Sequence, residues 1–188
     1  MRFERFPLYK FTFHILALMA AFTIASPASA AQEAYMRAEG ETQNVFTGDV
    51  SKTGYEGTIA VLKYSLSTNT PYDPATGVPT DNNQFRPVRV LKRVDQSSPL
   101  FVNAMANREV LRSVLIHFLR PSNPDPLEHF YTLELIDAQV VGITQFQGTL
   151  GDDQPLPKLE WIELTFETMI QTFEDGGIEA MDDWTDSP

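Results

Sequence analysis

Cysteine is absent from this 188-residue chain, and histidine occurs only three times. The first absence excludes disulfides, thiolate nucleophiles and cysteine metal sites. His117 and His129, the histidines outside the N-terminal segment, fit no HExxH or similar metal-ligand spacing. We therefore interpret both as structural or surface groups, and we expect neither a bound metal nor a cofactor.

Positive charge is also scarce, because 14 Lys and Arg oppose 25 Asp and Glu, for a net charge of -11. A phosphate backbone would be repelled, which excludes nucleic acid as a partner. The hydrophobic share of 43% and the charged share of 21% are typical of a folded globular protein. The length suits one domain with a real core.

A hydrolase motif is missing as well. Asp95, Ser97, Ser98 and His117 could be assembled into a Ser-His-Asp set, but no Gly-x-Ser-x-Gly elbow is present. The two serines are better explained by capping of a helix. The chain is therefore not predicted to be an enzyme.

The sequence also argues against two further kinds of site, one by the spacing of its residues and one by residues that are missing. Glu163 and Glu167 lie roughly 13 Å apart along an extended strand, beyond the usual separation of glycosidase carboxylates. The Gly-rich and Asp-rich turns lack the Lys-Ser/Thr of a phosphate loop and the closing Glu of an EF-hand. No catalytic, cofactor-binding or metal-binding residue is predicted.

The first 30 residues have the order of a secretory signal peptide. Arg2, Arg5 and Lys10 precede an apolar run, and small residues end the segment at Ala30. We expect cleavage after Ala30, with an uncleaved anchor as the alternative. The predicted organisation is a signal peptide at 1–30, a β domain at 31–176 and an acidic C-terminal tail at 177–188, which we expect to be partly loose.

Most apolar runs in the remaining chain alternate as strands do. Val88 and Val90 face one way and Arg89 the other, and Val114, Ile116 and Phe118 share a face. Strands are expected at 32–39, 58–67, 88–94, 112–120, 129–146 and 159–173. This pattern predicts an all-β-dominated fold, a barrel or sandwich of antiparallel strands.

The segment 159–173 is predicted to be a single strand with two unlike faces. The apolar face holds Ile162, Leu164, Phe166 and Ile170. The other face holds Trp161, Glu163, Thr165, Glu167 and Met169. A Trp and a Met among carboxylates indicate either a contact surface or an ordinary exposed strand with a stray Trp.

One short helix interrupts the strands, where residues 95–105 read "DQSSPLFVNAM". Ser98 is predicted to cap it, and Pro99 at the first helical position loses no hydrogen bond. One face is predicted to hold Phe101, Ala104, Met105 and Arg108, with Asn103 and Asn107 opposite. Because a helix ending near residue 109 is too short to be stable alone, it must dock on the sheet.

The connection over residues 69–86 is long for a compact domain. Its prolines restrict the unbound chain, so docking costs less entropy. We therefore expect this extended loop to be an interface.

Several blocks of sequence resemble the haemolysin-coregulated protein (Hcp) family, the tube subunit of bacterial type VI secretion. They are "DPATGVPTDNNQFRPVRVLKRVDQSSPLFVNAMANREVL", "FLRPSNPDPLEHFYTLELIDAQVVGI", "LEWIELTFETMIQTFEDGG" and "DDW", from about Tyr35 to Trp184. The resemblance implies a β-barrel with one packed helix and hexameric rings that stack into a hollow tube. It also implies a contractile sheath, a spike protein and effectors as partners, and a loop that reaches a neighbouring subunit or ring.

The predicted leader departs from this resemblance, because family members typically begin near the position of Ala34 and assemble in the cytoplasm. Either the start is assigned too early, or this is a relative exported to the periplasm or the outside. The alternative function is an exported β-sandwich binding module of the cell envelope, with Tyr72, Trp161 and Trp184 as an aromatic platform.

Overall fold

The computed structural model describes residues 32–80, 84–122, 127–150, 154–155 and 157–183. The predicted leader and Trp184 lie outside these residues. The elements are β1 (Glu33–Gly40), β2 (Asn44–Phe46), β3 (Ile59–Ser65), β4 (Thr68–Asn69), β5 (Gln84–Phe85), β6 (Val88–Arg93), α1 (Ser98–Asn107), β7 (Val110–Arg120), β8 (Glu128–Phe146), β9 (Thr149–Leu150), β10 (Gln154–Pro155), β11 (Leu159–Thr165), β12 (Thr168–Phe173) and β13 (Ile178–Asp183). Within the described part of the chain, no helix is long and apolar enough to cross a membrane.

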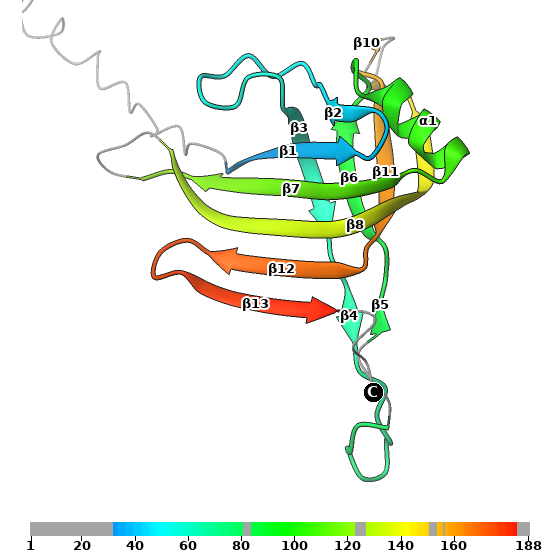
Figure 1. Ribbon diagram of the computed structural model, residues 1–188, viewed down its shortest axis with the longest axis vertical. Helices are drawn as coiled ribbons and strands as arrows, with labels where there is room; N and C mark the ends of the chain where they lie inside the picture. Colours follow the sequence, from blue (N-terminus) through cyan, green and yellow to red (C-terminus); the bar gives the residue numbers. More distant parts are fainter. Residues whose placement is uncertain (1–31, 81–83, 123–126, 151–153, 156, 184–188) are drawn as a thin grey trace, which may run out of the picture.

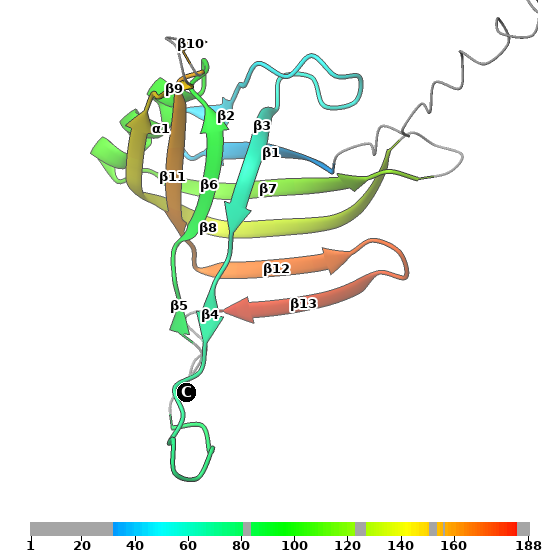
Figure 2. The same ribbon diagram turned by 180° about the vertical axis from the view of Figure 1, so that it is seen from behind.

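Six antiparallel strands close into a barrel, in the order β11-β6-β3-β1-β7-β8 with β11 pairing back to β8 (Figure 1). Closure satisfies the backbone groups that an open sheet leaves at its edges. The hairpin of β12 and β13 continues the sheet outward from the first half of β8, and α1 lies beside one end of the barrel (Figure 2). The predicted barrel of antiparallel strands with one packed helix is confirmed.

The long strand β8 pairs with β7 along one edge and with two different strands along the other. Its first half, to Ile136, pairs with β12, and its second half, from Gln139, pairs with β11. Asp137 lies between them with a φ of 49°, a left-handed conformation that Asp tolerates better than most residues. This residue marks the change of partner along β8.

The core is built from the inward positions of the barrel strands. Val88 and Val90 are fully buried, as are Val114 and Ile116 on β7. Their alternation with half-buried or exposed neighbours confirms the predicted face of β6, and that of β7 as far as Ile116. Beyond it a register shift buries Leu119, and Phe118 is only half-buried. Burying each such side chain contributes about 1.5 to 3 kcal/mol.

The prediction of one strand over 159–173 is wrong, because the chain turns at Phe166 and Glu167 to form β11 and β12. The two strands pair with different halves of β8, so the alternation restarts after the turn. Met169 is therefore buried and Ile170 only partly so, the reverse of the predicted faces. The acidic tail also differs from the expectation, since residues 178–183 form β13 against β12.

The helix begins as predicted, but Ser98 does not cap it. Ser97 is the N-cap residue, it makes no side-chain capping bond, and Ser98 lies in the first turn with Pro99. Phe101 is fully buried and its ring meets the ring of Phe46 edge-on at 5.0 Å. The docked face is narrower than predicted, because Met105 is 37% exposed and Arg108 is an exposed, left-handed C-cap.

Candidate assembly surfaces

The predicted long loop is a narrow hairpin extension that points away from the barrel (Figures 1 and 2). At its base β4 pairs with β5, and further out Tyr72 and Pro79 form a bridge. Near the tip, the Gly77 N–H donates to the Asp73 carbonyl at 2.7 Å, where Gly77 adopts a φ of 71° that favours glycine. The prediction of an extended connection is confirmed, but the connection is paired rather than irregular.

The Asp73 side chain organises the tip. Its carboxylate accepts hydrogen bonds from the Ala75 N–H at 2.8 Å and the Thr76 hydroxyl at 2.9 Å, and these bonds lower its pKa. Tyr72 and Val78 are 64% and 57% exposed on this ordered scaffold. Two large apolar side chains held in solvent on a projection are typical of a contact surface.

A second surface lies on the outer wall of β6 and β11. The Arg89 guanidinium lies 4.7 Å from the centre of the Trp161 ring, and its Nε is 3.0 Å from Glu163 Oε1. The cation–π contact holds the Trp161 side chain, whose role the sequence left open, and the ion pair with Glu163 holds Arg89 in place. Gly142 provides room for Glu163, because a Cβ there would lie 2.9 Å from its Oε2. Glu163 is paired with arginine, and Glu167 is exposed.

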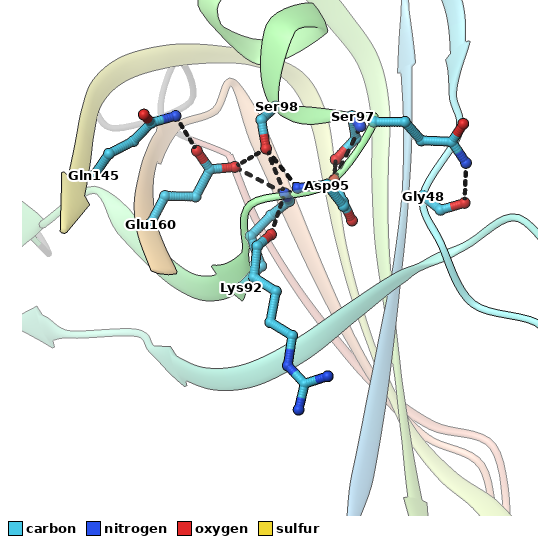
Figure 3. Close-up of polar contacts among 9 residues, drawn as sticks. Gly48, Lys92, Asp95, Ser97, Ser98, Gln145 and Glu160 are labelled. Atoms are coloured by element: carbon cyan, nitrogen blue, oxygen red, sulfur yellow. Dashed lines mark hydrogen bonds and ion pairs between the residues drawn. The ribbon is translucent and has the colours of Figure 1, made fainter. Parts of the chain in front are cut away.

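A buried polar cluster joins the start of α1 to the barrel (Figure 3). Lys92 is fully buried, and its Nζ lies 2.8 Å from Glu160 Oε1, 2.8 Å from Asp95 Oδ1 and 3.1 Å from Ser98 Oγ. It also donates to the Arg93 carbonyl at 2.7 Å. Ser98 Oγ donates to Glu160 at 2.6 Å and accepts from the Asp95 N–H at 3.0 Å.

The outer members complete the cluster. Gln145 on β8 donates to the second oxygen of Glu160 at 2.8 Å, and Ser97 donates its N–H and hydroxyl to Asp95. Gln96 donates to the Gly48 carbonyl at 2.6 Å, which ties the turn before α1 to the loop after β2. Every buried side-chain N or O atom in the described residues has a hydrogen-bond partner. The cluster therefore fixes α1, and the serines serve this packing.

The sequence reasoning missed Lys92 and Glu160. Period-2 alternation extends the inward series of Val88 and Val90 to Lys92, and that of Ile162 and Leu164 back to Glu160. The two residues lie directly opposite each other in the β6–β11 ladder. A lysine and a glutamate on the buried faces of two strands were the available signal for a buried ion pair.

The structure separates His117 from the serines. His117 lies on β7, where its ring contacts that of His129 on β8 rather than Asp95 or Ser98. The residues proposed for an aromatic platform are also separate, with Tyr72 on the hairpin extension and Trp161 on the barrel wall beneath Arg89. Trp184, the third member, lies outside the described residues.

Comparison with known proteins gives a consistent result. The family model described as "Type VI secretion system effector, Hcp" matches residues 35–173. The "Major exported protein" of Pseudomonas aeruginosa is 30% identical over 165 residues, covering 82% of this chain and 96% of the relative.

Solved structures share the fold. An Hcp protein is 24% identical with a TM-score of 0.75, and 82% of this chain matches 100% of that one. The secreted protein Hcp3 from Pseudomonas aeruginosa is 26% identical with a TM-score of 0.67, at coverages of 82% and 99%. The barrel, the helix docked on it and the family match over most of the chain show that this protein belongs to the Hcp family of type VI secretion.

Proposed function

We propose that the chain is a structural subunit of a type VI secretion tube, which forms hexameric rings that stack into a hollow conduit for effectors. The observation that carries this proposal is the hairpin extension, which presents Tyr72 and Val78 beyond the reach of its own barrel. Burial of these side chains requires a second molecule, and a neighbouring copy is the partner that a closed ring or stack supplies. Family membership supports the same assembly.

The other exposed features suit a head-to-tail contact between copies. Strand β13 pairs with β12 and with no other described strand, so it forms an edge of the sheet. Ile178 and Met181 on this strand are 67% and 68% exposed. The edge strand β13 and the hairpin extension are two different surfaces, and head-to-tail contacts in a cyclic assembly require two different surfaces.

The role proposed for the subunit is mechanical rather than catalytic. The Ser98 hydroxyl accepts a hydrogen bond from Lys92 and donates one to Glu160, so it is already engaged in the polar cluster beneath α1, which supports this role. The proposed partners are further copies of the chain, a contractile sheath, a spike protein and effectors carried in the lumen.

We further propose that the leader exports the chain and is cleaved after Ala30. The order of its three regions supports this step. N-terminal sequencing of the protein from intact cells tests it, with a start at Ala31 expected. A start downstream of Ala31 in protein recovered from the cytoplasm would refute export.

Deleting residues 72–82 and joining the ends with a short Gly-Ser linker tests the assembly role. The barrel is expected to fold, because the deletion leaves every barrel strand intact, whereas ring formation or ring stacking is lost or weakened. Circular dichroism reports the fold, and sedimentation with negative-stain microscopy reports rings and tubes. Unchanged rings and tubes would refute the role of the hairpin extension. A parent protein that is monomeric and binds a ligand through Tyr72 or Trp161 would favour the envelope-binding alternative.

A further inference from the structure

Two histidines meet on the outer face of the sheet, between β7 and β8. His117 lies opposite Thr132 in the ladder, and a register shift after Phe118 places Leu119 opposite His129. The Nδ1 atom of His117 is 3.1 Å from the Nε2 atom of His129, and the ring centres are 4.6 Å apart. The two imidazoles therefore make a direct ring-to-ring hydrogen bond.

One side of this pair carries negative charge. His129 Nε2 lies 2.9 Å from the Thr132 hydroxyl and 3.6 Å from Glu174 Oε1, and Thr132 donates to the same Glu174 oxygen. Glu174 follows β12, and Asp175 lines a cavity with His129. The pair therefore connects the β7–β8 ladder to the turn between β12 and β13.

The remaining charges near His129 are already paired with each other. Arg120 and Glu128 line the same cavity and form an ion pair across the β7–β8 ladder. The Arg120 guanidinium also lies 5.1 Å from the ring centre of Phe130. Glu174 and Asp175 are thus the carboxylates that remain to balance positive charge on the histidines.

The other side of the pair meets the loop between β2 and β3. The Tyr55 ring packs edge-on against His117 with centres 6.2 Å apart, and it stacks on Tyr35 of β1 at 4.8 Å. The same loop is held by Lys52, whose Nζ is 2.5 Å from Glu33. His117 is therefore a point of attachment for the Tyr55 loop.

A hydrogen bond between two ring nitrogens contains one proton, with one nitrogen donating and the other accepting. The pair can be neutral or carry one charge, which Glu174 balances. A second proton would place two N–H groups and two positive charges face to face. Burial and then the neighbouring His129 lower the pKa of His117, in agreement with this geometry.

We propose that His117 and His129 form an acid-sensitive latch, in which double protonation separates the rings and releases the Tyr55 loop and the Glu174 turn from the sheet. The group that the two rings share is a proton, because their ring nitrogens lie at hydrogen-bond distance from each other. This property goes beyond the tube role, because it makes local order depend on pH.

The direction follows from proton binding. A histidine whose pKa is lowered on folding binds its proton more readily in the open state, so acid favours opening. The stabilisation is fully present above the ordinary histidine pKa of about 6.5 and is lost as the pH falls through it toward the folded value.

Amide hydrogen exchange of the purified protein between pH 7.5 and 5.0, corrected for intrinsic exchange rates, tests the latch. Protection of residues 47–58 and 174–177 is expected to fall on acidification, by about tenfold for each pKa unit of depression. His117→Gln and His129→Gln should remove this pH dependence, and Glu163→Gln, which removes an ionisable group on the separate β6–β11 wall, should leave it intact. Equal pH dependence in the parent and His117→Gln would overturn the proposal.

An imidazole titration by NMR of the unmutated protein keeps the test valid if a variant fails to fold. A protonation step below the ordinary histidine pKa is expected for His117. Titration of His117 at the ordinary histidine pKa would refute the latch. Neither measurement requires rings to form, so failure of the tube proposal is distinguishable from failure of the latch.

Discussion

Lys92 Nζ and Glu160 Oε1 lie 2.8 Å apart in the interior of the barrel, where both side chains are fully buried. The two residues face each other across β6 and β11, and Ser98 at the start of α1 completes the contact. This ion pair fixes the position of the helix by hydrogen bonds rather than by apolar contact alone.

Removing one partner of the Lys92–Glu160 ion pair should lower the free energy of unfolding substantially. Lys92→Met leaves the Glu160 carboxylate buried beside Ser98 and Gln145, and we expect a loss of about 3 to 5 kcal/mol in the free energy of unfolding. The double variant Lys92→Met, Glu160→Leu removes both charges and should cost less than the sum of the two single changes. Urea unfolding of all four proteins measures the coupling.

The exposed pair Arg89 and Glu163 is the matched control, because it joins the same two strands on their outer face. Replacing either residue with Ala should cost no more than about 1 kcal/mol. If Lys92→Met cost as little as Arg89→Ala, the buried cluster would not be what positions the helix.

Substitutions of Phe101 and Met105 test whether the docked face of the helix is as wide as the sequence predicts or as narrow as the structure shows. The sequence places both on the docked face of the helix, whereas the structure buries Phe101 completely and leaves Met105 37% exposed. Phe101→Ala is expected to cost about 3 to 5 kcal/mol, and Met105→Ala about 1 kcal/mol or less. Thermal or urea unfolding compares them, and equal large losses would favour the wider face predicted from the sequence.

Glu109 should make the free energy of unfolding depend on pH, independently of His117 and His129. Burial raises its pKa, but hydrogen bonds to its carboxylate from the Gln43 N–H and the Thr42 N–H, each at 2.8 Å, outweigh burial and the net pKa is lowered. A carboxyl whose pKa is lowered on folding stabilises the protein above its unfolded pKa of about 4.3. That stabilisation is lost as the pH falls through the folded value.

The variant Glu109→Gln isolates this contribution. At pH 7 it should be less stable than the parent, and the difference should shrink as the pH falls below about 4, because the parent carboxyl is then also uncharged. Urea midpoints of both proteins across this range measure the effect. A difference that stays constant with pH would show that the loss arises from packing and not from charge.

Local pattern predicted the barrel strands well because each has one face in the core. The inward series follows period-2 alternation along β6, and along β7 and β8 in stretches separated by a change of phase. Pro99 correctly marked the start of the helix. Alternation could not locate the turn at Phe166, because that residue is itself buried and continues the apolar series of β11. The change of phase appears only when β12 pairs with the first half of β8.

The candidate surfaces were less accessible to sequence reasoning, since they depend on contacts between distant residues. Trp161 was recognised as unusual, but its cover by Arg89 requires knowledge of which strand lies beside β11. His117 and His129 likewise meet only through the register of β7 and β8. Their spacing along the chain matches no motif and gave no signal of the contact.

The hairpin extension should act in assembly through its two exposed apolar side chains. Tyr72→Ser combined with Val78→Ser should change the free energy of unfolding by no more than about 0.5 kcal/mol, because both side chains are mostly in solvent. Ring or tube formation should weaken markedly, since the contact loses its apolar area while the backbone of the hairpin extension is kept. Val102→Ser on α1, which is 43% exposed, is the control for loss of any exposed apolar group. Sedimentation velocity and negative-stain microscopy measure assembly at matched concentrations, and a double variant that assembles like the Val102→Ser control would eliminate these side chains as the contact.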